Sequence, residues 1–195
     1  MRELNHRVKN TLANVLSIMV LTKRRATDLD SFVESLSGRI RALSATHDVL
    51  TRSEWGDTYM GDVIDAEVSP YLGEADGQIA LSGPEIHLAP SDALSFGLAV
   101  HELVTNAAKY GALSTPNGKV SIDWEMVAPD RARVHWQESG GPPVSPPKRR
   151  GFGSELIEKI VAHELRSEVD LRFAPEGVEC TLTVPVRKAA PFRLR

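Results

Sequence analysis

The stretch from Ser91 to Tyr110 constrains the fold more than any other, because its pattern predicts a long amphipathic helix with one narrow polar stripe. Ser91 or Asp92 can cap the start of this helix, Pro90 precedes it, and Gly111 is a natural stop. At about 100° per residue, one side is apolar and nearly the opposite side is polar. The apolar side consists of Phe96, Val100, Leu103, Val104 and Ala107, and the polar stripe of Glu102, Asn106 and Lys109.

The polar stripe combines a carboxylate, an amide oxygen and an ammonium group at i, i+4 and i+7 spacing. Such groups suit a hydrated Mg²⁺ ion and the phosphates that it carries. A solvated helix face explains the stripe equally well when it is taken alone. The rest of the chain must therefore supply the other walls of a nucleotide pocket.

The composition excludes several classes of protein. The chain has 195 residues, a net charge of −3 and a single cysteine, Cys180. The charge argues against general nucleic-acid binding, and one cysteine excludes an internal disulfide framework and fits a reducing cytoplasm. No apolar run approaches the roughly 20 residues that span a membrane, and no signal-peptide pattern is present. We expect a cytoplasmic protein with no membrane segment in this chain.

The order of the predicted elements indicates an α+β fold in two parts. Two helices, at 2–24 and from about residue 31 to 50, are joined by a short loop, which predicts an antiparallel helical hairpin. Asp30 or Ser31 is the expected cap of the second helix. We place the hairpin at 1–54 and a second domain at 55–195. Strands near 78–81, 86–88, 119–127, 131–138, 168–173 and 178–186, with helices at 60–71, 91–110 and 154–165, predict a two-layer α/β sandwich with a mostly antiparallel sheet.

His6 lies on the first helix, nearly opposite its apolar stripe, and is expected to be exposed. An exposed neutral imidazole can act as a nucleophile toward phosphorus. Arg7 and Lys9 would keep it neutral and attract a phosphate. An inert surface histidine is the alternative for His6 in isolation. His47 shares the inward side of the second helix, so we expect it to be a core histidine.

Two glycine-containing segments could complete a nucleotide site. A strand that ends at Glu138 is followed by Gly140 and Gly141, so that the backbone can approach a flat ligand while the acid accepts a hydrogen bond from an exocyclic amine. The alternative is a simple turn. The second segment opens a helix, where amide groups and the helix dipole favour a phosphate. It consists of Lys148, Arg149, Arg150, Gly151, Phe152, Gly153 and Ser154.

Together these segments resemble a sensor histidine kinase of the HWE family. The segment Glu3-Leu-Asn-His6-Arg7-Val-Lys-Asn10 is typical of its phosphoacceptor box, and His101-Glu102-Leu-Val-Thr-Asn106 opens its asparagine box. Trp136-Gln-Glu138 matches the Trp-x-Glu of the first glycine box, and Gly151-Phe-Gly153 matches the second. The resemblance extends from residue 3 to about residue 186, with the boxes in family order.

The resemblance implies a dimerisation and histidine-phosphotransfer hairpin followed by an ATP-binding domain of the GHKL type. His6 would be the phosphoacceptor, Asn106 a Mg²⁺ ligand, and Glu102 a residue that organises the metal or a water. The remaining family positions would bind ATP: Lys109, Lys148, Arg149, Arg150, Gly151, Phe152, Gly153 and Ser154 at the phosphates, and Tyr110, Glu138, Gly140 and Gly141 at the adenine.

One position departs from most histidine kinases, because Arg7 follows the phosphoacceptor where an acid usually acts as a base. A neutral imidazole is already nucleophilic, so His6 needs another base or none; Glu3 is a candidate. The resemblance also implies a response regulator as acceptor, an upstream sensor domain or sensor partner, and a homodimer formed through the hairpin. Two alternatives remain: an adaptor with a degenerate nucleotide domain, and a serine kinase of the anti-sigma type.

Overall fold

The computed structural model describes residues 2–26, 28–53, 58–72, 77–145 and 152–187. Within these ranges, the side chains of residues 2–11, 14, 25, 152 and 159–161 lie outside the description. No helix in the described part of the chain combines the length and the apolar character that crossing a membrane requires.

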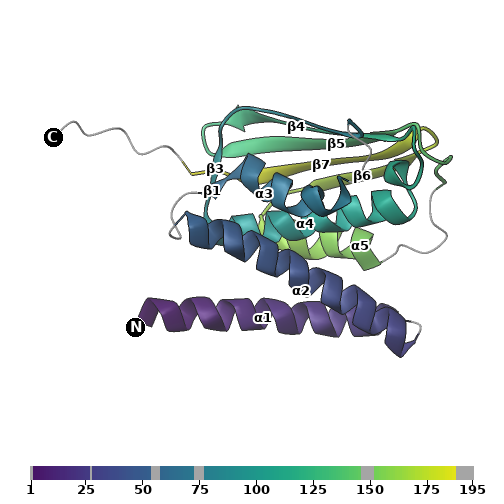
Figure 1. The fold of residues 1–195 in the computed structure, drawn as a ribbon. Coiled ribbons are helices and arrows are strands. Elements are labelled where there is room, and N and C mark those ends of the chain that lie inside the picture. Colours follow the sequence, from purple (N-terminus) through teal and green to yellow (C-terminus); the bar gives the residue numbers. More distant parts are fainter. Residues whose placement is uncertain (1, 27, 54–57, 73–76, 146–151, 188–195) are drawn as a thin grey trace.

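The amino-terminal part is an antiparallel pair of helices, α1 (Arg2–Arg25) and α2 (Leu29–Arg52), as the pattern predicted (Figure 1). Asp28 caps α2, not Asp30 or Ser31 as expected. The Asp28 carboxylate accepts from the Ser31 amide at 2.7 Å, and the Asp28 amide donates to the Ser31 hydroxyl at 3.3 Å. This reciprocal capping box satisfies two backbone donors at the start of α2. Ser31 occupies the third position of the helix.

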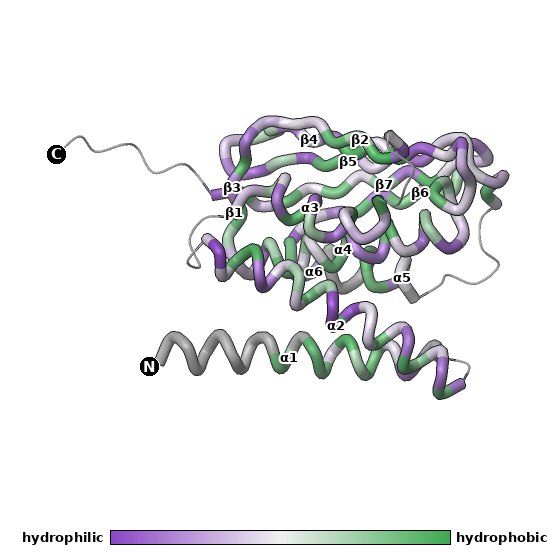
Figure 2. Tube along the Cα trace, viewed as in Figure 1, coloured by the Kyte–Doolittle hydropathy of each residue, from purple (hydrophilic) through white to green (hydrophobic). Residues whose placement is uncertain are grey.

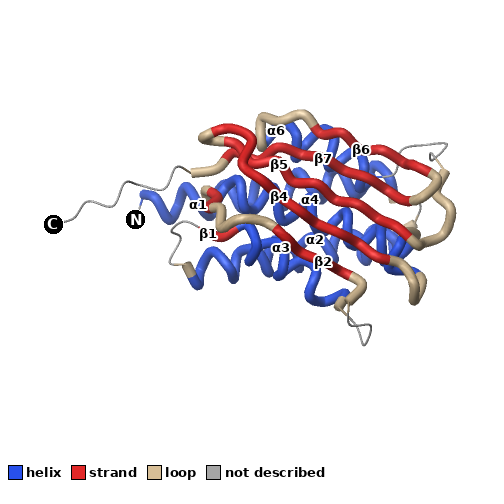
Figure 3. Tube along the Cα trace, turned by 90° about the horizontal axis from the view of Figure 1, so that it is seen from above, coloured by secondary structure: helices blue, strands red, loops and turns tan. Residues whose placement is uncertain are grey.

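The second part is a two-layer sandwich in which helices cover one face of a five-stranded sheet (Figure 3). The strand order is β2-β4-β5-β7-β6; β2 pairs with β4 in parallel, and the other pairs are antiparallel. A separate antiparallel pair joins β1 and β3, of which β1 was not predicted. The strands are β1 (Thr58–Tyr59), β2 (Ile79–Ser82), β3 (His87–Leu88), β4 (Lys119–Ala128), β5 (Arg131–Ser139), β6 (Val169–Ala174) and β7 (Gly177–Pro185). The predicted α+β class is therefore confirmed.

The helices of the second part largely match the predicted spans. The last predicted helix differs, because a π-helical turn interrupts it. The helical elements are α3 (Met60–Val68), η1 (Ser69–Tyr71), α4 (Pro90–Lys109), η2 (Ala112–Ser114), α5 (Phe152–Glu155), the π-helical η3 (Leu156–Val161) and α6 (Ala162–Glu164). No side chain caps α4: Pro90 occupies its first turn after Ala89, so the expected caps Ser91 and Asp92 lie inside the helix.

Helix α4 lies between the sheet and the hairpin (Figure 1). The five residues of its predicted apolar side are all at most 3% exposed and belong to the main core. Across from them, α2 approaches so closely that a Cβ on Gly97 would overlap the Thr46 hydroxyl. Val49 and Leu50, near the end of α2, also belong to the main core. The hairpin is thus continuous in packing with the second part.

The hairpin keeps an exposed apolar surface on the side away from α4. His47 is half-buried with its Nδ1 atom 3.5 Å from the Thr51 hydroxyl, so it is not the core histidine that the pattern predicted. The exposed large apolar side chains, between 39% and 73% accessible, are Leu12, Leu16, Met19, Val20, Leu29, Val33 and Ile40 (Figure 2, green on α1). On α1, Leu12, Leu16, Met19 and Val20 are spaced so that they share one face of the helix.

Candidate functional site

Two neighbouring cavities meet at the carboxyl-terminal half of α4. The first, of about 390 Å³, lies between α2 and α4, and the predicted stripe of Glu102, Asn106 and Lys109 forms part of its wall. The second, of about 370 Å³, lies between α4 and the sheet. Asn106, Tyr110 and Ser154 line both cavities, so the two cavities adjoin at these residues. Volumes of this size accommodate small ligands.

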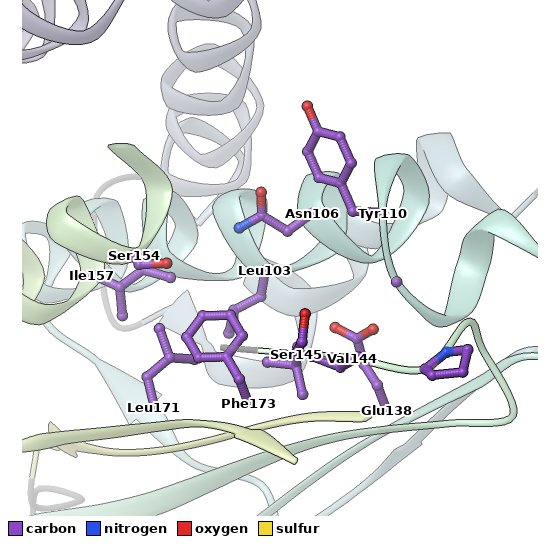
Figure 4. Close-up of a pocket in the computed structure, with 13 residues that line it drawn as sticks. Leu103, Asn106, Tyr110, Glu138, Val144, Ser145, Ser154, Ile157, Leu171 and Phe173 are labelled. Atoms are coloured by element: carbon purple, nitrogen blue, oxygen red, sulfur yellow. The ribbon is translucent and has the colours of Figure 1, made fainter. Parts of the chain in front are cut away.

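The second cavity is apolar with a few polar groups at its edge (Figure 4). Figure 4 shows Glu138 below the cavity with its carboxylate pointing toward α4, while Asn106 and Tyr110 point from α4 toward the hairpin. Apolar walls with few polar groups suit a flat heterocycle. The apolar lining comes from Leu103, Pro143, Val144, Ile157, Leu171, Phe173 and Val178.

Glu138 is 3% exposed and is held by two donors. The Ala112 amide donates to Oε2 at 2.8 Å, and the Trp136 indole donates to Oε1 at 3.2 Å. Burial raises the pKa of Glu138, while these two hydrogen bonds oppose the rise. Gly111 leaves room for the carboxylate, because a Cβ there would overlap its Oε2 atom. A buried carboxylate that receives two hydrogen bonds offers its remaining lone pairs to a ligand donor.

Glu102, 4% exposed, is paired with Arg39 of α2. The Arg39 Nε atom lies 2.8 Å from Oε1, and its Nη2 donates to Oε2 at 3.0 Å. The Nη2 contact is a charge-assisted hydrogen bond, and the Nε contact is a close ion-pair distance. Both oxygens of Glu102 therefore face the hairpin in this arrangement, and the metal-organising role stays a prediction for a state in which Arg39 has moved.

Lys109 of the stripe contacts the hairpin, and Tyr110, next to it, is largely exposed to solvent. Lys109 Nζ lies 2.7 Å from Glu34 Oε1, and this pairing raises the pKa of Lys109 and lowers that of Glu34. Tyr110 is 73% exposed at the rim of both cavities. The first cavity thus has a second wall, which α2 supplies.

His101 links three helices instead of entering the second cavity. Its Nδ1 atom lies 3.3 Å from Glu67 Oε2 on α3, and the Thr46 hydroxyl on α2 donates to Glu67 Oε1 at 2.9 Å. Glu67 is 3% exposed. The sequence reasoning missed Arg39, Thr46 and Glu67, because nothing near them in the sequence marks them as partners of α4.

Of the predicted glycines, Gly153 lies beside the polar stripe of α4, whereas Gly140 and Gly141 follow β5. Gly153 lies against the stripe, since a Cβ there would come within 2.7 Å of Glu102 Oε2 and 3.1 Å of Asn106 Nδ2. Gly140 has a φ of +69°, and a Cβ on Gly141 would crowd the Ala112 backbone. Among the described residues that line either cavity, neither Gly140 nor Gly141 occurs. Their predicted role at the adenine stays a prediction.

Several predicted residues lie beyond what the structure describes. Lys148, Arg149, Arg150 and Gly151 fall outside the described ranges. His6 belongs to α1 and Phe152 begins α5, but the side chains of both lie outside the description. Their roles stay predictions.

The residues where the two cavities adjoin could bind a metal ion that is already coordinated by the phosphates of a ligand. Mg²⁺ usually takes few protein ligands and completes its shell with phosphates and water. Asn106 offers its side-chain oxygen at this junction. Within the described ranges, no group of three or more His, Cys, Asp or Glu residues could hold a metal ion. The donor set therefore suits a metal–triphosphate complex better than a metal held by protein alone.

Comparison with known proteins agrees with this architecture. Residues 3–85 match the model of the family described as HWE histidine kinase. Blue-light-activated histidine kinases of Brucella anthropi and Brucella ovis are 39% and 35% identical over 188 residues. Each alignment covers 95% of this chain and 38% of the relative, so the chain spans less than two fifths of these curated relatives.

Solved structures share the fold. The histidine kinase domain from the Erythrobacter litoralis EL346 blue-light activated histidine kinase matches with a TM-score of 0.69 and 22% identity, over 95% of this chain and 90% of that one. The mycobacterial sensor histidine kinase MprB matches with a TM-score of 0.54 and 20% identity, over 69% of this chain and all of that one. At these identities the likeness concerns the fold.

Proposed function

Because this chain belongs to the HWE histidine kinase family, we propose that it binds Mg-ATP in the two adjoining cavities and transfers the γ-phosphoryl group to His6. The observation that carries this proposal is the junction of an apolar cavity, with the Glu138 carboxylate at its edge, and a polar cavity at Asn106. The two compartments have the characters that a purine base and a triphosphate require.

The apolar cavity would hold the adenine. Glu138 would accept a hydrogen bond from the exocyclic amine, and the surrounding apolar side chains would exclude water from the ring. Tyr110 would cover the open rim, and Gly140 and Gly141 would shape the turn beside it. The base would thereby fix the direction in which the phosphates leave the cavity.

The polar cavity would hold the phosphates. Asn106 would bind the Mg²⁺ that accompanies ATP, which neutralises charge on the triphosphate. Lys109, Lys148, Arg149 and Arg150 would add positive charge, while Gly151, Phe152, Gly153 and Ser154 would bring amide groups close. Glu102 would organise the metal or a water once Arg39 releases it.

His6 would attack the γ-phosphorus in line as a neutral imidazole, with Glu3 as a candidate base. Figure 1 shows the amino end of α1 and helix α5, which borders both cavities, at opposite ends of the molecule. Transfer would therefore require the hairpin to move or the site of a second copy to be used. A second copy could cover the exposed apolar stripes of α1 and α2, which would form a four-helix bundle.

The partners proposed for this activity follow from the family. An aspartate on the receiver domain of a response regulator would accept the phosphoryl group, and a sensor domain or sensor partner would control the hairpin. We place the protein in the cytoplasm, where ATP is available.

Incubation with γ-labelled ATP tests the proposal. We expect label that is stable to base, labile to acid and absent from His6→Ala, which should still bind nucleotide. Asn106→Ala should lose both Mg-ATP binding and labelling while it stays folded, because it removes the proposed metal ligand between the two cavities.

The same experiment separates the alternatives. Nucleotide binding without label on this chain would favour an adaptor, and label only on serine of an added protein would favour an anti-sigma-type serine kinase. Normal labelling of Asn106→Ala would contradict the proposed metal ligand.

A further inference from the structure

Helix α2 carries charges in an order that complements the polar stripe of α4. Arg39 of α2 pairs with Glu102, and Glu34 of α2 pairs with Lys109. Along α4 toward its carboxyl end, Glu102 thus meets a cation and Lys109 then meets an anion. A metal–triphosphate complex would offer the stripe the same order of charges, because its metal is positive and its phosphates are negative.

The Arg39 guanidinium reaches the carboxylate beside the proposed metal ligand. Its Nη2 atom donates to Glu102 Oε2 at 3.0 Å. A Cβ on Gly153 would come within 2.7 Å of that same oxygen and within 3.1 Å of Asn106 Nδ2. The guanidinium, the Asn106 amide and the glycine of the proposed phosphate segment therefore all adjoin one carboxylate.

The two ion pairs between α2 and α4 differ in burial. The side chains of Arg39 and Glu102 are 9% and 5% exposed, whereas those of Lys109 and Glu34 are 45% and 71% exposed. An exposed pair contributes little, but a buried carboxylate without a cation is costly. Either Arg39 or a metal ion can neutralise Glu102, and two cations beside it would repel each other.

We propose that α2 is an internal competitor of the metal–nucleotide complex, with Arg39 in place of the metal at Glu102 and Glu34 in place of a phosphate at Lys109. This inference rests on the proposed function and specifies how the same site is regulated. Docking of this part of α2 and binding of Mg-nucleotide oppose each other. Because such coupling is reciprocal, weakening the docking strengthens the binding by the same factor.

Arg41 provides a matched control for Arg39. It lies two residues further along α2, is exposed, and lines the same cavity. The arginine that contacts Glu102 is Arg39. Replacing either arginine with methionine removes one positive charge from the cavity wall, but only Arg39→Met releases the carboxylate.

The experiment measures the dissociation constant of ADP, with Mg²⁺ and with EDTA, for the intact chain and for Arg39→Met and Arg41→Met. We expect Arg39→Met to bind Mg-ADP about tenfold more tightly than the wild type and to bind metal-free ADP equally well, so that the advantage given by Mg²⁺ grows about tenfold. Arg41→Met should keep the wild-type advantage. An advantage that is unchanged or smaller in Arg39→Met would overturn the inference and leave the proposed function standing, whereas a wild type that binds neither form would overturn both.

A measurement on the wild type keeps the inference testable if Arg39→Met does not fold. Mg-ADP should speed the hydrogen exchange of the backbone amides of residues 34–41, because a helix without its packing partner is marginal in water. ADP with EDTA should not. Amides around Thr46 should stay protected in both cases, since the Thr46 hydroxyl donates to the buried Glu67 at 2.9 Å. Exchange at residues 34–41 that is the same with and without Mg²⁺ would contradict the competition.

Discussion

The two buried carboxylates of the site, Glu138 and Glu102, are held from different directions. The donors to Glu138 come from Ala112 and Trp136, within the same sandwich. The donor to Glu102 is Arg39, 63 residues earlier on the hairpin. The proposed base end of the site therefore lies within one part of the fold, whereas the proposed phosphate end also includes residues of α2.

In the proposed site, recognition of the base and control of the phosphates by the hairpin would depend on different residues. A base would enter the cavity at Glu138 whatever the position of the hairpin. A movement of α2 would change the charge at the proposed phosphate end, because Arg39 pairs with Glu102 and Glu34 pairs with Lys109. Three changes test this comparison.

Arg39→Met should have the largest effect, because it leaves Glu102 buried without its partner. Removing one member of a buried ion pair typically costs about 3–5 kcal/mol in the free energy of unfolding. Urea unfolding measures the loss, and Arg133→Met is the control, since Arg133 and Glu125 form an exposed pair at 3.5 Å. The double variant Arg39→Met/Glu102→Gln should recover much of the stability. A single-variant cost no greater than that of Arg133→Met would contradict the importance of the pair.

Gly111→Ala should have the next largest effect, and at the base end alone. A Cβ at position 111 would overlap Glu138 Oε2 and come within 3.0 Å of the Ala107 Cα. We expect ADP binding to weaken at least tenfold, because the displaced carboxylate loses its alignment with the Ala112 amide. Gly61→Ala is the control, since its Cβ would make only an ordinary 3.7 Å contact with Trp124. Unchanged ADP affinity in Gly111→Ala would show that the carboxylate can shift freely.

Glu138→Gln should have the smallest effect, seen as a change with pH. Burial raises the pKa of Glu138 in the folded state above its unfolded value. Its contribution to stability is thus fully present below the unfolded pKa and is lost as the pH rises through the folded pKa. Relative to Glu138→Gln, the wild type should lose stability in urea unfolding as the pH rises above the unfolded pKa of glutamate, about 4.3. A difference in the free energy of unfolding between the two proteins that does not change with pH would show that burial does not shift the pKa of Glu138.

The sequence predicted the surroundings of Glu138 better than those of Glu102, because the contacts of Glu138 are closer in the sequence. The alternation along β5 places Glu138 inward, and the same period could have identified Trp136 as its neighbour. The helical period correctly aligned Glu102, Asn106 and Lys109. Arg39 has no such signal: it is one of several arginines on α2, and only the packing of α2 on α4 selects it.

The sequence pattern also could not decide which of several neighbouring, chemically similar residues takes a given role. Asp28, Asp30 and Ser31 can all cap a helix, and the structure uses Asp28 because Ser31 can then complete the reciprocal pair. The predicted inward side of the second helix also differs, since Leu43 is 8% exposed whereas Ile40, three positions earlier, is 43% exposed. The inward side of α2 shifts along its length because it crosses α4 at an angle (Figure 1).

The burial of Val49 and Leu50 in the main core gives the hairpin a fixed end. Glu34 and Arg39 lie nearer the α1–α2 connection than this end does. A tilt of α2 about Val49 and Leu50 would consequently displace both ion-pair partners of α4 at the same time.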